Sequence, residues 1–421
     1  MTRVYYSLYD RMLSKERLHK AFLKVKSAKG AAGVDGQTIE DFAGDLQRNL
    51  DMLVKELKEK SYRPFPVRRV EIPKAGGGKR KLGIPTVRDR VVQQALLNIL
   101  QPIFDPEFHP SSYGYRPGRS CHQAIAKATM FIRNYERQWV VDMDLTKCFD
   151  TLDHDIIIKA FRKRVTDGSI LKLLRMFLQS GVMTEEGWQA STEGSPQGGV
   201  ISPLIANVYL DAFDQFMKSR KQRIVRYADD TLIFTRSRSA ADNALKQATR
   251  YLEGKLKLTV NQQKTHIVHS SEGVKFLGVV IRTGFTGIQE KKKREFKEKM
   301  KKITRRNSPV NLEKIIADLN PLVRGFANYF RIANCKEVFR ELSGWVRRRL
   351  RAKQLALWKR PKRLHRRLRQ LGYRSEFKAI KMSSWRNAAS PLASLAIPNK
   401  YLRELGLFDL SFVQTGIPVS L

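Results

Sequence analysis

The sequence predicts an α+β protein with more than one domain, and three observations lead to this prediction. Helical and strand-like segments alternate between about residues 5 and 288. Two of the apolar strand segments end in aspartates. Beyond about residue 288 the composition changes to basic helices. A chain of 421 residues is also too long for a single hydrophobic core, so we expect two or three domains.

The spacing of apolar residues predicts each element in turn. Helices are expected between about residues 5 and 60, interrupted by a glycine-rich loop at residues 29–36, with Thr38 as the N-cap of a helix from Ile39 to Leu57. The elements expected after them are a basic β-hairpin over residues 67–84, a helix over 87–100, an apolar strand over 139–145, helices from 155 to about 180, a helix over about 203–218, a hairpin over 224–235, a helix over 240–256, and short extended segments over 258–260, 265–268 and 274–279. Three helical regions follow: a basic one around 291–306, one with aromatic residues over 319–330, and a basic one over 345–369.

The charge balance indicates a polyanionic partner. Lys and Arg number 80 against 40 Asp and Glu, which gives a formal net charge of +40. Nucleic acid is the leading candidate, because a compact monomer with this much charge repels itself. A basic protein of the membrane surface is the alternative, but the sequence has no lipidation motif and no long apolar helix.

The cysteines and the N-terminus narrow the class of protein further. The three cysteines, Cys121, Cys148 and Cys335, form no CxxC pair, which argues against a zinc module and a disulfide framework and fits a reducing cytosol. The N-terminal residues lack the apolar core of a signal peptide.

The most informative stretch is IVRYADDTLIFT, residues 224–235. Two apolar runs typical of strands flank Ala-Asp-Asp, which predicts a hairpin with Asp229 and Asp230 at its tip. Adjacent carboxylates repel each other and lose hydration, so a divalent cation, most often Mg²⁺, is expected to neutralise them. The alternative is a solvated Asp-Asp turn.

Asp144 is the third carboxylate that such a metal site requires. It ends the apolar strand Trp139 to Leu145, and it meets the hairpin tip if the two strands are neighbours in one sheet. Three such acids can hold two Mg²⁺ ions about 3.5–4 Å apart, the arrangement that activates a 3′-hydroxyl and stabilises a leaving pyrophosphate. Asp142 is left out of the set because we expect it to point the other way on the strand.

These segments together resemble a known family. The stretches that carry the resemblance are, in order, RRVEIPKAGGGKRKLGIPTVRDRVVQQAL, SSYGYRPGRSCHQAI, VVDMDLTKCFDTLDHDII, EGSPQGGVISPLIANVYLD, RYADDTLIF, VNQQKT, FLG, VRGFANYF and WVRRRLRAKQLALWKR. Their order is similar to that of group II intron-encoded reverse transcriptases, which also act as maturases. The resemblance covers most of the chain.

The resemblance implies a right-hand polymerase. Fingers and palm would occupy residues 1–288, an α-helical thumb or maturase (X) domain 289–371, and a small DNA-binding region 372–421. The implied reaction is extension of a DNA or RNA primer with dNTPs on an RNA template. The expected partners are template, primer and the group II intron RNA, with no membrane and an unknown oligomeric state. A bacterial cytoplasmic location, at the nucleoid when the protein acts on DNA, is also implied.

The resemblance also assigns roles to individual residues. Two Mg²⁺ ions, with Mn²⁺ able to substitute, would be held by Asp144 and Asp229, with Asp230 assisting and the Leu145 carbonyl completing one ion. The other implied positions are Lys74 and Arg80 on the triphosphate, Phe149 as the sugar gate that prefers deoxynucleotides, Gln197 under the same nucleotide, Lys264 near the triphosphate, and Phe276, Leu277 and Gly278 as the primer grip.

Several points stay open at this stage. Phe149 is alternatively a core residue, and Lys264 a surface lysine. Tyr113, Tyr115, Arg116 and Arg119 contact template or nucleotide, or else form a structural turn. The loop from Lys29 to Ile39 resembles a fingers insertion that closes over the template. Cys148 stands where many relatives have an aromatic residue, and no nuclease module with paired cysteines follows, as in the shorter relatives.

Three alternative functions also remain. One is an RNA-binding splicing maturase with an unused polymerase site. Another is a free-standing enzyme of DNA repair or phage defence. The last is an RNA-synthesising polymerase, which Phe149 disfavours.

Overall fold

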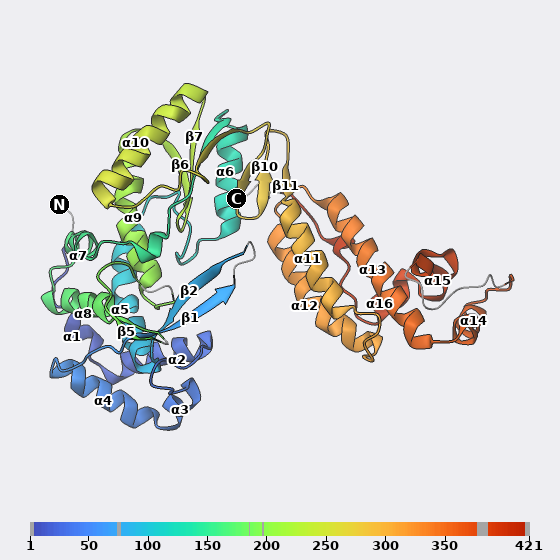
Figure 1. The fold of residues 1–421 in the computed structure, drawn as a ribbon, viewed down its shortest axis with the longest axis horizontal. Coiled ribbons are helices and arrows are strands. Elements are labelled where there is room, and N and C mark those ends of the chain that lie inside the picture. The colour runs from blue at the N-terminus through green and yellow to red at the C-terminus, as the bar shows by residue number, and fades with distance from the viewer. Residues whose placement is uncertain (1–3, 74–76, 185, 196–197, 377–385, 417–421) are drawn as a thin grey trace. The chain divides into compact units, whose positions relative to one another are not determined.

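The computed structural model describes residues 4–73, 77–184, 186–195, 198–376 and 386–416. The chain forms two compact units, Met1–His269 and Ser270–Leu421 (Figure 1). The first combines helices with two four-stranded sheets, and the second is mainly helical, so the predicted α+β organisation is confirmed. The domain boundaries expected near residues 288 and 371 stay predictions.

The first unit contains most of the elements. Its helices are α1 (Tyr9–Met12), α2 (Lys15–Ala28), α3 (Ile39–Gly44), α4 (Leu46–Lys58), α5 (Val87–Phe104), η1 (Asp105–Glu107), α6 (Cys121–Arg133), η2 (Cys148–Asp150), α7 (His154–Arg162), α8 (Gly168–Gln179), α9 (Ser202–Ser219) and α10 (Arg238–Leu256). Its strands are β1 (Val67–Pro73), β2 (Lys79–Ile84), β3 (Trp139–Met143), β4 (Val182–Thr184), β5 (Gly187–Gln189), β6 (Arg223–Tyr227), β7 (Asp230–Thr235) and β8 (His266–His269).

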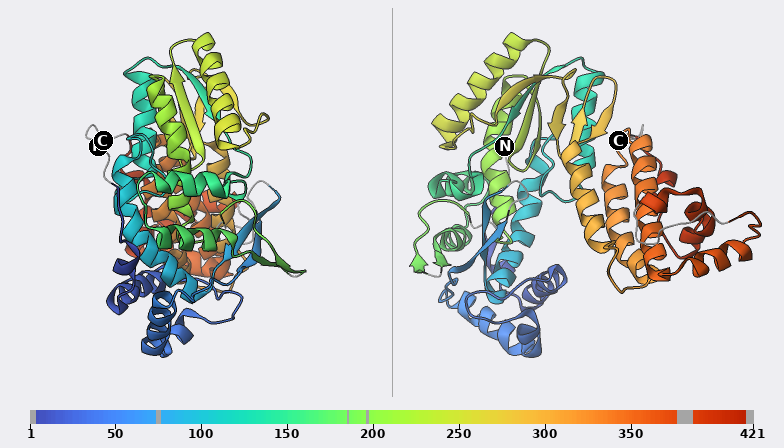
Figure 2. Two further views of the ribbon diagram at one scale, coloured as in Figure 1. Left: turned by 90° about the vertical axis from the view of Figure 1, so that its left-hand side faces the viewer. Right: turned by 45° about the vertical axis from the view of Figure 1, so that its right-hand side comes forward.

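The central sheet of the first unit has the strand order β6-β7-β3-β8, and all neighbouring pairs are antiparallel. Helix α10 packs against β3 and β7, whereas α6 packs against β6 and β7. Figures 1 and 2 show α10 and α6 on either side of these strands. Val141 and Ile233 face the main core of the unit, and both are fully buried. Helices on both faces of this sheet explain why its two central strands, β3 and β7, are mainly apolar.

The second sheet contains the basic hairpin. Strands β1 and β2 pair antiparallel, as predicted, and β4 adds to β1 in parallel, giving the order β2-β1-β4-β5. The β4–β5 hairpin was not predicted. Each of its strands has only three residues, which is too short to show an alternating pattern.

The N-terminal helices follow the capping signals. The Thr38 hydroxyl accepts a hydrogen bond from the Asp41 backbone N–H at 3.0 Å, and the Asp41 carboxylate accepts one from the Thr38 backbone N–H at 2.9 Å. This reciprocal capping box confirms Thr38 as an N-cap. The helix expected from Ile39 to Leu57 is divided in two at Asp45, directly after Gly44, a residue that disfavours helix.

The second unit begins with a small sheet of order β11-β10-β9, formed by β9 (Val274–Phe276), β10 (Val279–Ile281) and β11 (Thr286–Ile288). Its helices are α11 (Glu290–Ile303), α12 (Leu312–Phe330), α13 (Lys336–Trp358), α14 (Pro361–Gln370), η3 (Arg386–Ala389), α15 (Pro391–Ala396), α16 (Asn399–Glu404) and η4 (Leu410–Phe412). The basic region expected over residues 345–369 therefore consists of two helices. Pro361 stands at the start of α14, because proline lacks the N–H that a continuing helix needs. Among the described residues, no helix is long and apolar enough to span a membrane.

Candidate active site

The Asp-Asp pair lies at the tip of a tight hairpin, as the sequence predicts. Tyr227 pairs with Asp230 across β6 and β7, so Ala228 and Asp229 form a two-residue turn. Ala228 has a φ of 59°, in the left-handed region that is unfavourable for residues with a side chain. The turn therefore needs support from its surroundings to keep this conformation.

The buried side chain of Arg226 supplies part of that support. Arg226 is 1% exposed and donates from Nη1 to the Ala228 carbonyl at 2.8 Å. The same nitrogen donates to Asn207 Oδ1 at 3.0 Å, while Nε and Nη2 donate to the Asp214 carboxylate at 2.6–2.9 Å. Asn207 and Asp214 both lie on α9 and are themselves buried. A fully paired guanidinium thus connects the turn to the helix beneath it.

A loop beside β6 holds the other side of the turn. The Arg226 backbone N–H donates to the Ser111 carbonyl at 2.9 Å, and its carbonyl accepts from the Tyr113 N–H at 2.9 Å. A Cβ atom at Gly114 would lie only 2.2 Å from the Ala228 nitrogen, so this position excludes any side chain.

The sequence left open whether the tyrosines and arginines of this loop contact template or nucleotide or form a structural turn, and the structure answers this in part. Arg116 is buried, pairs with Asp105 at 2.8 Å and donates to backbone carbonyls, so it is structural. Tyr113 is also buried, with Arg119 stacked over its ring. Tyr115, in contrast, is half exposed. Burial of its hydroxyl is the main cause that raises the pKa of this group, and the charge of Asp229 is the second.

Asp144 lies beside the hairpin tip. Strand β3 pairs with β7, with Met143 opposite Thr231, so Asp144 follows directly at the strand end. Its carboxylate accepts a hydrogen bond from Asn261 Nδ2 at 3.1 Å and lies 3.4 Å from Lys264 Nζ. The neighbouring strands that the prediction required are therefore present. Lys264 is 68% exposed at its side chain and remains beside the carboxylates.

The expectation that Asp142 points away from this cluster is wrong. Residues two apart on a strand face the same side of a sheet, so Asp142 shares the face of Asp144, while Val141 and Met143 face the core. The charge of Asp142 contributes to raising the pKa of Asp230. Asp142 also lies 3.8 Å from His266 Nε2 on the neighbouring strand β8.

The carboxylates repel one another. Desolvation, followed by the charges of Asp229, Asp142 and Asp144, raises the pKa of Asp230 to about 7. Burial, and then the charge of Asp144, also raises the pKa of Asp229, which Arg80 partly opposes. Asp230 is more than a third exposed, so water screens part of this repulsion. Because a bound cation competes with protons for such groups, metal affinity is expected to rise with pH.

The side chains that meet here offer carboxylate oxygens, which suit a hard cation. Within the described ranges, however, no three Asp, Glu, His or Cys side chains are arranged around one point that could hold an ion. The carboxylates are neighbours that repel one another, with the Lys264 ammonium close to Asp144.

A cavity of about 670 Å³ opens beside these residues. One side consists of basic residues from the β1–β2 hairpin, and the other contains Asp144, Leu145 and Asp229. Residues 189–195 also line it, together with Lys147, Cys148, Asp150, Thr151, Val182 and Lys264. The hairpin residues in the lining are Arg69, Lys79, Arg80 and Lys81. A cavity with cations on one side and carboxylates on the other suits a polyphosphate bound through a metal ion.

Two of the expected nucleotide contacts, Lys74 and Gln197, lie outside the described residues. Phe149 lies in η2 next to the cavity-lining Cys148, and its ring meets that of Tyr115 edge to face with centroids 6.2 Å apart. It is half buried and packs against the main core on one side. The packing against the core agrees with the core alternative, and the role of Phe149 as a sugar gate stays a prediction.

The expected primer-grip residues form a turn in the second unit. Leu277 and Gly278 link β9 to β10, both with positive φ, as in the two-residue hairpins whose twist matches the strands. Tyr329 Oη donates to the Leu277 carbonyl at 2.9 Å, and the Gln289 N–H donates to the Gly278 carbonyl at 3.1 Å. Helix α12 therefore fixes this turn.

Sequence reasoning missed the residues that support the site. Arg226 was quoted within RYADD without a role, although a cation inside an otherwise apolar strand signals a buried ion pair. Asn207 and Asp214 give a similar signal within the apolar helix α9. Asn261 stands in VNQQKT, three residues before Lys264, and carries no signal of its own.

Comparisons with known proteins agree with this geometry. Residues 72–281 match the family described as reverse transcriptase (RNA-dependent DNA polymerase), and residues 293–372 match the maturase-specific domain of group II introns. Protein YkfC of Escherichia coli is 38% identical over 60% of this chain and 76% of its own length. The group II intron-encoded protein LtrA of Lactococcus lactis is 28% identical over 68% of this chain and 58% of its own.

The match to solved structures is more distant. An apo telomerase from Candida tropicalis has a TM-score of 0.41 at 16% identity, over 56% of this chain and 58% of that chain, which is too remote to bear on function. The chain spans less than two thirds of LtrA. The similarity to YkfC and the two family matches show that the chain belongs to the reverse transcriptases of group II intron type, RNA-directed DNA polymerases that carry a maturase-specific domain.

Proposed function

We propose that this chain extends a primer 3′-end with dNTPs on an RNA template by two-metal phosphoryl transfer. The observation that carries the proposal is the meeting of two strand ends, with Asp144 on one and Asp229 and Asp230 on the other, beside a cavity lined by cations. Burial and mutual repulsion raise the pKa values of Asp229 and Asp230, and bound divalent cations would offset that repulsion.

In this proposal Asp144 and Asp229 hold two Mg²⁺ ions, for which Mn²⁺ can substitute, and Asp230 and the Leu145 carbonyl assist. Two such ions would lower the pKa of the primer hydroxyl and neutralise the leaving pyrophosphate. The side chain of Asn261 donates to Asp144 and so orients its carboxylate toward the cavity. Reverse transcriptases use divalent metals as a family; the identity and number of the ions here belong to the proposal.

The remaining roles concern the nucleotide and the primer. Arg80 lines the cavity and, with Lys74, would bind the triphosphate. Phe149 would exclude a 2′-hydroxyl, and Gln197 would bind the same nucleotide. Lys264 would lie near the triphosphate, and residues 276–278 would hold the primer backbone.

Primer extension tests the proposal directly. A primer annealed to an RNA template is incubated with Mg²⁺ and either dNTPs or NTPs, using the wild-type chain and Asp229→Ala. We expect extension with dNTPs, little extension with NTPs, and a loss of about 10³-fold or more in the variant, because one charge of the metal site is missing. Failure of the wild type to extend any primer, with RNA binding retained, would replace the polymerase with an RNA-binding maturase.

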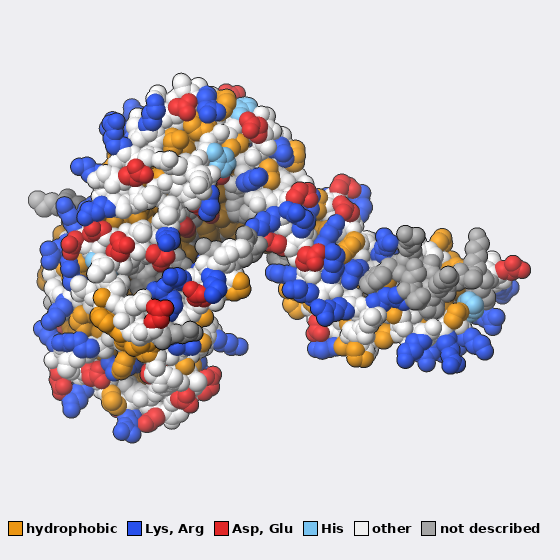
Figure 3. Space-filling model, in the orientation of Figure 1, with side chains coloured by type: hydrophobic (Ala, Val, Ile, Leu, Met, Phe, Trp, Pro, Cys, Tyr) orange, Lys and Arg blue, Asp and Glu red, His pale blue; other side chains and the backbone are white. Residues whose placement is uncertain are grey.

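A second role, binding of group II intron RNA to assist splicing and mobility, is favoured by helix α14. Its apolar residues Leu364 and Leu368 are buried, while Lys and Arg make up most of its other positions. Lys and Arg side chains gather around this helix in Figure 3, with no acidic residue in its sequence. Such a surface fits the phosphate backbone of structured RNA. We place this activity in the bacterial cytoplasm, at the nucleoid during DNA synthesis.

Charge removal on α14 tests the RNA role. The variant Lys362→Gln/Arg363→Gln/Arg366→Gln is expected to bind intron RNA about tenfold or more weakly and to reduce the slope of log K against log salt by about 2 to 3, because each lost phosphate contact removes part of the counterion release. Fluorescence anisotropy at several salt concentrations measures both quantities.

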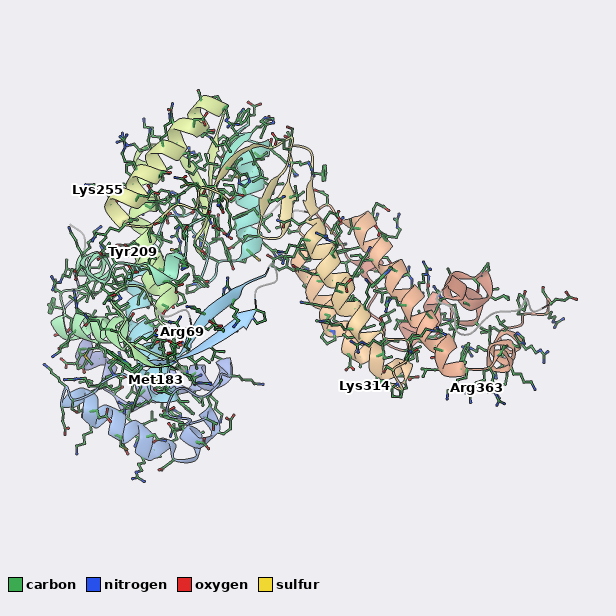
Figure 4. All side chains as sticks on the ribbon, viewed as in Figure 1. Arg69, Met183, Tyr209, Lys255, Lys314 and Arg363 are labelled. Atoms are coloured by element: carbon green, nitrogen blue, oxygen red, sulfur yellow. The ribbon has the colours of Figure 1, made fainter. Side chains whose placement is uncertain are left out.

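The matched control changes three exposed cations on a helix of the first unit, Lys246→Gln/Arg250→Gln/Lys255→Gln on α10. Figure 4 labels Lys255 on α10 and Arg363 on α14. Equal losses of affinity in the two triple variants would mean that only net charge matters and would rule out a dedicated RNA surface on α14.

A further inference from the structure

Two loops that border the active-site cavity are joined through their backbones. The first follows β3 and carries Phe149, and the second contains Glu193, Gly194 and Ser195. The Ser195 N–H donates to the Phe149 carbonyl at 2.7 Å, and the Gly194 N–H donates to the Leu152 carbonyl at 2.8 Å. Any movement of the second loop is therefore transmitted to the backbone of Phe149.

Gly194 makes this contact possible. Its φ is +84°, and a Cβ atom there would lie 2.6 Å from the Asp150 carbonyl oxygen. The two backbones are in direct contact with no side chain between them. Their separation is thus set by this backbone contact and by hydrogen bonds, without a packed side chain as a spacer.

His154 supplies the third of these hydrogen bonds. Its side chain is buried, and Nε2 lies 2.8 Å from the Gly194 carbonyl oxygen. Because a carbonyl can only accept, Nε2 carries the proton in this contact. His154 is the first residue of α7, and Asp153 caps that helix by accepting from the N–H groups of Asp155 and Ile156 at 2.9 and 3.0 Å. The imidazole therefore belongs to the first residue of a helix whose N-terminus is capped.

The far end of the second loop is fixed independently. The Val200 N–H donates to Gln93 Oε1 on α5 at 2.8 Å, and Ser195 Oγ donates to Ser202 Oγ at 2.8 Å. Loss of the His154 contact would therefore loosen the loop on the side that faces Phe149, while Val200 stays attached to α5.

We propose that His154 is a positioning residue that determines sugar selectivity, because it fixes the gap between Phe149 and the Gly194–Ser195 loop. The inference rests on the proposed polymerase function and on Phe149 as its sugar gate. A gate of this kind rejects a 2′-hydroxyl by close contact, so a small widening admits ribonucleotides. His154 does not touch the nucleotide. It acts through the Gly194 carbonyl and the Ser195–Phe149 hydrogen bond.

The test compares two substitutions of the same residue. In His154→Leu the donor is lost, whereas in His154→Gln an amide N–H can reach the same carbonyl. The measured quantity is the ratio of kcat/KM for a dNTP to that for the matching rNTP, which does not depend on how much of the enzyme is folded. We expect His154→Leu to lower this ratio by about tenfold and His154→Gln to keep it within about threefold of the wild type.

A double-mutant cycle tests whether His154 acts through Phe149. If His154 acts through Phe149, adding His154→Leu to Phe149→Ala should lower the ratio no further than Phe149→Ala alone. An unchanged ratio in His154→Leu, or an additive effect in the double variant, would overturn the inference. If His154→Leu yields no folded protein, His154→Met is measured by the same standard.

Different results would refute the polymerase function and the role of His154. A wild-type chain that does not extend a primer refutes the polymerase itself. A wild type that extends with dNTPs, beside a His154→Leu variant with equal loss for both sugars, leaves the polymerase intact and makes His154 a purely structural residue.

Discussion

Replacing Asp144 by Asn is expected to reduce dNTP addition by about 10³-fold or more while the fold is retained. The substitution keeps the shape of the side chain but removes the charge that would attract a cation to the end of β3. The loss should be largest at low Mg²⁺ and only partly recovered at high Mg²⁺. Single-turnover addition of one dNTP across a Mg²⁺ titration measures both effects.

Asp142→Asn is the matched control for this prediction. It makes the same change two residues earlier on the same strand face, where the carboxylate lies near His266 and not at the strand end. We expect the rate to fall by less than about tenfold, because the charge of Asp142 contributes to the pKa of Asp230 from a position that is not at the strand end. Equal losses in Asp142→Asn and Asp144→Asn would mean that Asp144 has no special place in the metal site.

Arg226→Met is expected to lower the free energy of unfolding of the first unit by roughly 3–5 kcal/mol, since it leaves Asp214 buried without its cation. Asp214 is fully buried and accepts three hydrogen bonds from the guanidinium. The Ala228 carbonyl also loses its donor, so dNTP addition should fall even in the fraction that stays folded. Denaturant titration followed by circular dichroism and primer extension measure these two losses.

Two further variants separate charge from geometry. Arg226→Met/Asp214→Leu removes both charges and should recover much of the stability but not the activity, because the turn still lacks its donor. Arg223→Met makes the same change at an exposed position of the same strand and should alter stability by less than about 0.5 kcal/mol. A loss below about 1 kcal/mol in Arg226→Met would contradict the role of this pair as the support of the turn.

The local features of this protein could be predicted because each depends on neighbouring residues. The apolar runs around Ala-Asp-Asp specify the β6–β7 hairpin, and the spacing of Thr38 and Asp41 specifies a capping box. The proximity of Asp144 to the hairpin tip required one further assumption, that β3 and β7 are neighbours, and the sheet has that order. The family resemblance supplied the rest of the candidate site.

The features that were missed depend on partners far apart in the sequence. The Arg226–Asp214 pair joins a strand to a helix, and the short strand β4 of the missed β4–β5 hairpin also pairs with the distant strand β1. A sequence pattern carries no record of such pairings. The error at Asp142 was of a different kind, since the strand period itself places residues 142 and 144 on one face.

The bond from Arg226 to Ala228 also bears on how the enzyme responds to heat. The turn that carries Asp229 is tied to a buried side chain, not to surface groups, so we expect it to loosen only when the interior around α9 opens. Activity should therefore persist on warming until this unit melts cooperatively, without a gradual decline beforehand. The working temperature of the enzyme is then set by the packing beneath the turn, and stabilising substitutions around α9 are the ones that would raise it.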